Sequence, residues 1–140
     1  MGLWHNSCKY PKGMRQDTPS WNQAQGRLGE AFAKKYLLRQ GYKIVAERFR
    51  TRFGEIDLVA SRRDALLFLE VKARHSRLFG DALEAVTPKK LRHFQKSVMA
   101  FLQANPQYRR GWHWELAAAA VRHAGGETKV ELVRILPGGL

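Results

Sequence analysis

The sequence predicts a single α/β domain of mixed α+β type, with a central mixed five-stranded sheet flanked by helices. Apolar stretches of strand length alternate with two longer segments of helical periodicity, and glycine, proline or polar residues separate them. The chain has 140 residues, which suits one domain, and its hydrophobic fraction of 44% is ordinary for a globular protein. The expected order of elements is α-β-β-β-α-β-β.

The first part of the chain is expected to differ from the rest. Residues 1–20 mix glycine, proline, serine and lysine without periodicity, so we expect a flexible leader followed by one domain over 21–140. The leader has no apolar signal core, and no apolar run in the chain approaches the roughly 20 residues that span a bilayer. A single cysteine, Cys8, excludes an intramolecular disulfide. These features predict a cytoplasmic protein without a membrane partner.

The first helix is expected over about 21–40, with Ser20 as its N-cap and Gly41 just after its last turn. Glu30 shares one helical stripe with Ala33 and Leu37. The pattern leaves open whether Glu30 is a solvated carboxylate or belongs to a site. The main apolar surface of this helix is expected from Leu28, Ala31, Phe32, Tyr36 and Leu38.

Five strands are expected from the remaining apolar stretches. Residues 54–60 and 66–73 form a hairpin around a short polar turn. The other three strands are expected at 42–49, 112–121 and 128–136.

A second helix is expected over 88–104, because Thr87 suits an N-cap and Pro88 the first helical position. Lys89 and Lys90 place positive charge in its first turn, which opposes the helix dipole. A bound anion would offset that cost, and a solvated basic face is the alternative. Its apolar face is expected from Leu91, Phe94, Val98, Phe101 and Leu102.

The overall charge indicates a polyanionic partner. Lysine and arginine number 25 against 12 aspartate and glutamate residues, so the net charge is +13. Nucleic acid is the commonest partner of such a basic surface. A generically basic protein is the alternative, and the spread of charge along the chain suits a basic face better than a basic arm.

Three ionisable residues lie in the otherwise apolar hairpin, although unpaired charges in a buried sheet are costly. If the hairpin closes through 63–64, or through 62–65, Asp57 lies directly opposite Glu70, where like charges destabilise. A divalent cation between them removes this conflict, and oxygen ligands favour Mg²⁺ or Mn²⁺. Lys72 shares a strand face with Glu70 and is then placed to orient an attacking water. A structural salt bridge from Lys72 to Glu70 or Asp57 is the alternative.

Asp57 followed by 70–72, Glu-Val-Lys, matches the D…(D/E)-x-K core of restriction-endonuclease-like nucleases. With the stretches 26–30, 50–58 and 68–74 around it, the chain resembles the YraN-like family of uncharacterised proteins over about residues 22–136. The resemblance implies a fold similar to archaeal Holliday-junction resolvases and a predicted nuclease whose activity and substrate are not settled for the family. It implies that Asp57 and Glu70 bind the metal, that Lys72 is the catalytic lysine, and that Glu30 completes the metal site.

The resemblance also suggests nucleic-acid contacts. Lys90 and Arg74 are candidates for phosphate contacts, and Lys89 and Arg50 complete the predicted set. The chain departs from the family pattern at Arg48, where the family tends to have asparagine. It departs again at Glu115, where aspartate is typical. The histidines interpreted as surface or phosphate-facing residues are His75, His93, His113 and His123.

The sequence therefore predicts a metal-dependent endonuclease that acts on DNA, including branched or structured DNA, with Mg²⁺ or Mn²⁺ as cofactor. Two alternatives stay open: a non-catalytic nucleic-acid-binding module that keeps the nuclease fold, and an RNA-binding or ribosome-associated basic domain. A homodimer is a further expectation, because a two-fold-symmetric junction suits a symmetric partner.

Overall fold

The computed structural model describes residues 19–74, 87–124 and 126–135, and these residues form two helices, five strands and one 3₁₀ turn. The predicted mixed α+β class and the order α-β-β-β-α-β-β are confirmed. The elements are α1 (Pro19–Arg39), β1 (Lys43–Thr51), β2 (Gly54–Arg62), β3 (Ala65–Arg74), α3 (Pro88–Ala104), η2 (Pro106–Tyr108), β4 (His113–Ala124) and β5 (Glu127–Ile135).

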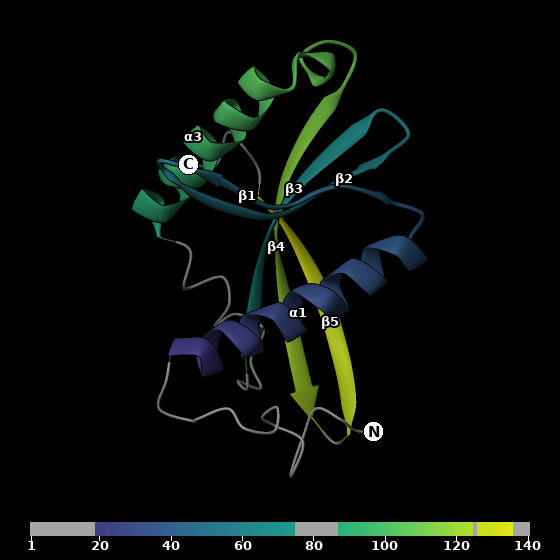
Figure 1. Ribbon diagram of the computed structural model, residues 1–140. Coiled ribbons are helices and arrows are strands. Elements are labelled where there is room, and N and C mark those ends of the chain that lie inside the picture. Colours follow the sequence, from purple (N-terminus) through teal and green to yellow (C-terminus); the bar gives the residue numbers. More distant parts are fainter. Residues whose placement is uncertain (1–18, 75–86, 125, 136–140) are drawn as a thin grey trace.

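The strands form one sheet in the order β1-β2-β3-β4-β5. β3 and β4 are parallel, whereas the other neighbours are antiparallel, so the sheet is mixed as predicted. α3 lies in the connection between the two parallel strands, which need a crossover of this kind. Figure 1 shows α1 crossing one face of the sheet and α3 lying against the other.

Each helix closes its own core cluster. Ala33 and Leu37 of α1 pack on alternate residues of the strands, including Leu67 and Leu69. The intervening residues Leu66 and Phe68 face α3. The central strand β3 is therefore buried on both faces, which explains why it reads as an unbroken apolar run.

α3 has the predicted bounds and cap. The Thr87 hydroxyl accepts a hydrogen bond from the Lys90 backbone N–H at 3.2 Å. Phe101 is 2% exposed, and its ring meets those of Phe49 and Phe68 edge to face at 5.0 and 5.5 Å between centroids. The five residues predicted for the apolar face of this helix are all buried: Leu91, Phe94, Val98, Phe101 and Leu102.

The predicted apolar surface of α1 was right for Phe32 and Tyr36, which pack against the core cluster, and wrong for Leu28, Ala31 and Leu38, which are exposed. Leu28 and Leu38 are 36% and 51% exposed, whereas Ala33 and Leu37 are fully buried. The helix is thus rotated so that the stripe that includes Glu30 faces the sheet. It also begins at Pro19, so Ser20, predicted as its N-cap, lies inside the helix.

The predicted register of the central hairpin is confirmed. Arg62 pairs with Ala65 and Leu58 with Leu69, so the turn consists of residues 63–64. Arg63 adopts a positive φ of 57°, as a tight turn of this kind requires. The backbone ladder ends at Leu58, one position before Asp57 would meet Glu70.

Some predictions lie outside the described residues, namely those for 1–18 and for most of the polar loop after β3. Within the described part of the chain, neither helix is both long and apolar enough to cross a membrane.

Replacing Phe101 by alanine should lower the free energy of unfolding by roughly 3–5 kcal/mol, because it opens a cavity where three aromatic rings meet. Met99→Ala on the same helix is the matched control, since Met99 is 58% exposed and should cost less than about 1 kcal/mol. Urea unfolding of both variants checks this packing, and equal losses would contradict it.

Candidate active site

Strands β2 and β3 and helix α3 enclose a cavity of about 350 Å³. β2 contributes Asp57, and β3 contributes Glu70 and Lys72. Lys90 and His93 enter from α3. The fold therefore brings into one cavity two predicted metal ligands, the predicted catalytic lysine and one predicted phosphate contact.

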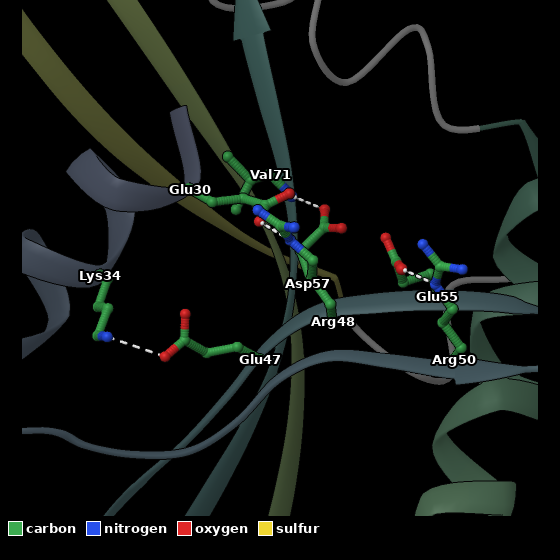
Figure 2. Close-up of polar contacts among 8 residues, drawn as sticks. All are labelled: Glu30, Lys34, Glu47, Arg48, Arg50, Glu55, Asp57 and Val71. Carbon is green, nitrogen blue, oxygen red and sulfur yellow. Dashed lines mark hydrogen bonds and ion pairs between the residues drawn. The ribbon is translucent and has the colours of Figure 1, made fainter. Parts of the chain in front are cut away.

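Asp57 lies where β2 separates from β3. Its Oδ2 accepts a hydrogen bond of 2.7 Å from the Val71 backbone N–H (Figure 2), so a side chain continues the connection after the backbone ladder has ended. The strict alternation of faces along β2 is broken here, because Ile56 and Val59 both join the cluster under α3 although they are three positions apart. Asp57 lies within this irregular stretch, at the edge of the core.

Burial makes the carboxyl group of Asp57 a weaker acid than usual. Its pKa is raised from 3.8 to about 7, and loss of solvation is the largest cause, which the hydrogen bond from Val71 only partly opposes. Repulsion from the nearby carboxylates Glu30, Glu70 and Glu55 contributes to the same shift. Near neutral pH this group is therefore balanced between its protonated and its ionised form.

The carboxylates around Asp57 are neutralised one by one. Each of three has a nearby cation, drawn in part in Figure 2: Arg48 Nε to Glu30 Oε1 at 2.8 Å, Arg50 Nε to Glu55 Oε2 at 3.0 Å, and Lys72 Nζ to Glu70 Oε2 at 2.6 Å. Asp57 is the member of this group that has no ion pair within the described part of the chain. Among the described residues, the acidic cluster consequently keeps one partly buried carboxylate that forms no ion pair of its own.

Arg48 is a residue of this site that the sequence patterns missed. It follows a β-bulge in β1 and lies at the register position opposite Asp57, with a positive φ of 50°. Its hydrogen bond to Glu30 raises the pKa of the guanidinium, and the charges of Glu55 and Asp57 add to this effect. A left-handed backbone at a non-glycine residue is uncommon, and asparagine tolerates it better than arginine does. This suits the asparagine that the family resemblance suggests at the same position.

The donor set suits a divalent cation that keeps part of its water shell. Among the described residues, no three histidine, cysteine, aspartate or glutamate side chains form a ready metal cluster. Asp57 and Glu70 nevertheless line one cavity, and none of the described cations forms an ion pair with Asp57. Mg²⁺ is commonly held by one or two carboxylates, together with water and substrate phosphate, so this pair fits it.

The other predicted site residues lie around the cavity rather than in it. Glu30 is 19% exposed on α1 and is bound to Arg48, so the solvated alternative for it is wrong. Its role as a metal ligand stays a prediction. Lys89 is exposed on α3, Arg50 is 84% exposed at its side chain, and Arg74 ends β3 with its side chain outside the described part.

The structure places His93 in the wall of the cavity, which the sequence did not predict. It lies one turn after Lys90 on α3 and lines the same cavity. The i to i+3 spacing from Lys90 is the signal that would have placed both on one helix face. Glu115, the other departure from the family pattern, lies away from the cavity and pairs with Arg134 at 2.8 Å.

Fold and cavity together define a basic mixed α+β domain in which a twisted sheet presents carboxylates and a lysine beside a basic helix. The chain matches the uncharacterised protein family UPF0102 over residues 29–128 and belongs to that family. The predicted resemblance to YraN-like proteins is thereby confirmed.

Several relatives carry the same family name. The UPF0102 protein of Trichlorobacter lovleyi is 37% identical over 111 residues, which are 79% of this chain and 87% of that protein. The relative from Syntrophomonas wolfei is 42% identical over 62% of this chain and 76% of its own length. That from Rhodopseudomonas palustris strain BisB18 is 49% identical over 59% of this chain and 60% of its own length. Their names state no activity.

One solved structure shows a weak overall likeness. SfsA from Pyrococcus furiosus, in complex with Ca²⁺, has a TM-score of 0.33 and 12% identity to this chain, and the match covers 81% of this chain and 62% of that one. A likeness of this size carries no argument about fold or function.

Asp57→Asn should change how stability depends on pH. The raised pKa means that the folded protein holds a proton that the unfolded chain would release. The stabilising contribution is therefore fully present below about pH 4 and is lost as the pH rises through 7. The variant escapes this loss, so its free energy of unfolding at pH 8 should exceed that of the wild type by roughly 2–4 kcal/mol.

Urea unfolding at pH 4, 6 and 8 in the presence of EDTA measures the effect. Asp64→Asn is the control, because the Asp64 side chain is 66% exposed and its replacement should leave the pH profile as it is. Parallel wild-type and Asp57→Asn profiles would rule out the buried, uncompensated carboxylate.

Arg48→Ala should destabilise the protein by roughly 1–3 kcal/mol at pH 8, because it leaves Glu30 mostly buried without its ion pair. The loss should shrink at pH 5, where carboxylates left without the guanidinium can take up protons. Arg50→Ala is the matched control and should cost less than about 1 kcal/mol, since its pair with Glu55 is exposed. Thermal unfolding of both variants at the two pH values makes the comparison.

Proposed function

We propose that this protein is a metal-dependent endonuclease that hydrolyses phosphodiester bonds in DNA, including branched or structured DNA. The observation that carries the proposal is the cavity in which Asp57, Glu70 and Lys72 meet the basic helix α3. Buried carboxylates with a neighbouring lysine have little structural value in a sheet, because apolar residues would be less costly there. They suit a site that handles a cation and a phosphate.

Asp57 and Glu70 are the residues that would hold the metal. A bound Mg²⁺ or Mn²⁺ ion supplies Lewis-acid chemistry, polarising the phosphoryl oxygen and making water a better nucleophile. Asp57 contributes a carboxylate that forms no ion pair with any of the residues that the structure describes. A cation beside Asp57 would favour the ionised form of its carboxyl group and so lower its pKa, and the group would then be ionised at neutral pH.

Lys72 is the proposed catalytic lysine. Its ammonium group is held at 2.6 Å from Glu70 and faces the same cavity as Asp57. There it can orient the attacking water and stabilise the negative charge that grows on the phosphoryl oxygens. The water oxygen would form a new bond to phosphorus and release one proton to solvent, while the bond to the leaving sugar oxygen would break and that oxygen would take up a proton from solvent. The products are a terminal phosphate and a free hydroxyl group.

Charge supports nucleic acid as the substrate. The net charge is +13, and Lys90 and His93 line the cavity on the side of α3. The ammonium group of Lys90 beside the carboxylate pair would attract and position a phosphodiester that the carboxylates alone would repel.

A second candidate is a nucleic-acid-binding module that keeps this fold without turnover. It is favoured by the ion pairs of Glu30 with Arg48 and of Glu70 with Lys72, which already compensate two of the carboxylates. In this case the binding surface would be used and the metal would not be required.

Cleavage assays separate the two candidates. With labelled single-stranded, duplex and four-way-junction DNA, the intact protein should cut at least one substrate only when Mg²⁺ or Mn²⁺ is added. Asp57→Asn and Lys72→Met should each lower the rate by roughly 100-fold or more, while DNA affinity measured in EDTA stays within about threefold of the wild type.

Lys35→Met is the control for loss of a lysine, since Lys35 is exposed on α1 at the opposite face of the sheet. Salt-dependent binding with no cleavage of any substrate at any metal concentration would establish the binding module. Weaker binding with an unchanged rate per bound complex would remove Asp57 and Lys72 from the chemistry.

A further inference from the structure

A second hollow lies beside the candidate active site. It has a volume of about 590 Å³ and is formed by the β1–β2 turn and the outer side of α3. Phe53 lines both hollows, so the two are contiguous at this residue. Arg52, Arg92 and Lys96 supply its charges, and Met99, which is 58% exposed, supplies part of its apolar surface.

The charge of this hollow is of one sign. Its lining includes no aspartate or glutamate, and helix α3 contains none along its whole length. Within the described part of the chain, Arg52, Arg92 and Lys96 form no ion pair, whereas Lys34 and Arg48 beside α1 are paired. Arg92 and Lys96 are four positions apart on one helix face, where like charges repel. An anionic ligand would relieve this repulsion.

Phe53 holds two of these cations in place. Arg52 Cζ lies 4.9 Å and Lys96 Nζ 5.4 Å from the centre of its ring. Attraction to the face of an aromatic ring compensates cations that have no carboxylate partner. The pair is therefore arranged before a ligand arrives, which reduces the entropy lost on binding.

The turn that carries Arg52 and Phe53 is fixed to α3. The Phe53 backbone N–H donates to Thr51 Oγ1 at 3.0 Å, and the Thr51 hydroxyl donates to the Gly54 carbonyl at 2.9 Å. Thr51 Oγ1 also shares a hydrogen bond of 2.8 Å with the hydroxyl of Ser97, which is 1% exposed. These bonds keep the turn and the helix at a constant separation on both sides of the hollow.

We propose that this hollow, called here the Arg52–Lys96 subsite, binds backbone phosphates of the nucleic acid next to the phosphate at the candidate active site. The proposal rests on the proposed nucleic-acid function. It goes further by giving the path of the nucleic-acid strand over the surface, which leads from the Asp57 cavity across Phe53 and along α3. Arg52 and Lys96 contact phosphates, and the apolar surface of Met99 and Ala100 accommodates the sugar and base between them.

The test is a binding titration in EDTA that measures no cleavage. Fluorescein-labelled single-stranded and duplex DNA are titrated with wild-type protein and with the double variant Arg52→Gln/Lys96→Gln between 50 and 200 mM salt. Each lost phosphate contact should reduce the slope of log K against log salt concentration by about 0.7 on single strands and about 0.9 on duplex. The double variant should thus lose between one and two units of slope.

Two further variants refine the test. Lys35→Gln/Lys43→Gln removes the same number of exposed charges at other positions and should leave the slope within about 0.3 of the wild type. Phe53→Leu keeps both cations but removes the ring, so it should weaken binding about two- to fivefold. Equal slopes for the two double variants would overturn the proposal.

Poly-glutamate serves as competitor. If it displaces DNA at equal charge concentration, and itself loses affinity for Arg52→Gln/Lys96→Gln to the same degree, the hollow binds acidic polypeptide and the nucleic-acid assignment fails. Binding of DNA through these residues by a chain that cuts nothing would uphold the subsite and refute the nuclease. If the protein cuts DNA in a metal-dependent way but the double variant keeps wild-type affinity and slope, the nuclease is upheld and the subsite is refuted.

Discussion

The burial of one carboxylate constrains the whole neighbourhood of Asp57. A charged group at the edge of a core must find a partner, and within the described part of the chain Asp57 finds the Val71 backbone N–H and no ion pair, at the point where two strands separate. Its neighbours are each matched with a cation, so the protein leaves the unbalanced charge at one place. The packing of the sheet, which is buried on both faces under separate clusters, offsets the free-energy cost of this unpaired carboxylate. A stable scaffold therefore carries a locally unfavourable site, an arrangement that is common where chemistry takes place.

Local patterns in the sequence predicted much of this arrangement. The cap at Thr87, the apolar face of α3 and the register of the central hairpin depend on neighbouring residues or on a short turn, and all three are confirmed. The face of α1 was predicted correctly at Phe32 and Tyr36 and wrongly at Leu28 and Leu38, which look more apolar than Ala33, although small residues let a helix approach a sheet closely. Arg48 was missed for another reason: no periodic pattern indicates a left-handed backbone in a strand, nor an ion pair to a helix 18 positions earlier.

Net charge alone describes this protein poorly, because its cations belong to two populations. Around α1 and β5, Lys34, Arg48, Arg122 and Arg134 are matched with carboxylates and belong to the folded architecture. Along the outer side of α3 and the β1–β2 turn, the positive charges have no carboxylate partner within the described residues. Pairing across the fold joins residues that are far apart in the chain, so the sequence could show the excess of charge and not where that excess is exposed. The cations of α3 and of the β1–β2 turn border the candidate site.

The parallel pairing of β3 with β4 has a consequence during synthesis of the chain. All the side chains of the candidate site belong to residues 30–97, which leave the ribosome before any of β4. Until β4 docks, β3 is an open edge whose Leu66, Leu67, Phe68 and Leu69 have unpaired backbone groups on one side. Long apolar edges of this kind invite pairing with other chains. A nascent chain that stalls between α3 and β4 thus holds every part of the site and is prone to aggregate, which makes completion of the sheet, not assembly of the site, the vulnerable step in biogenesis.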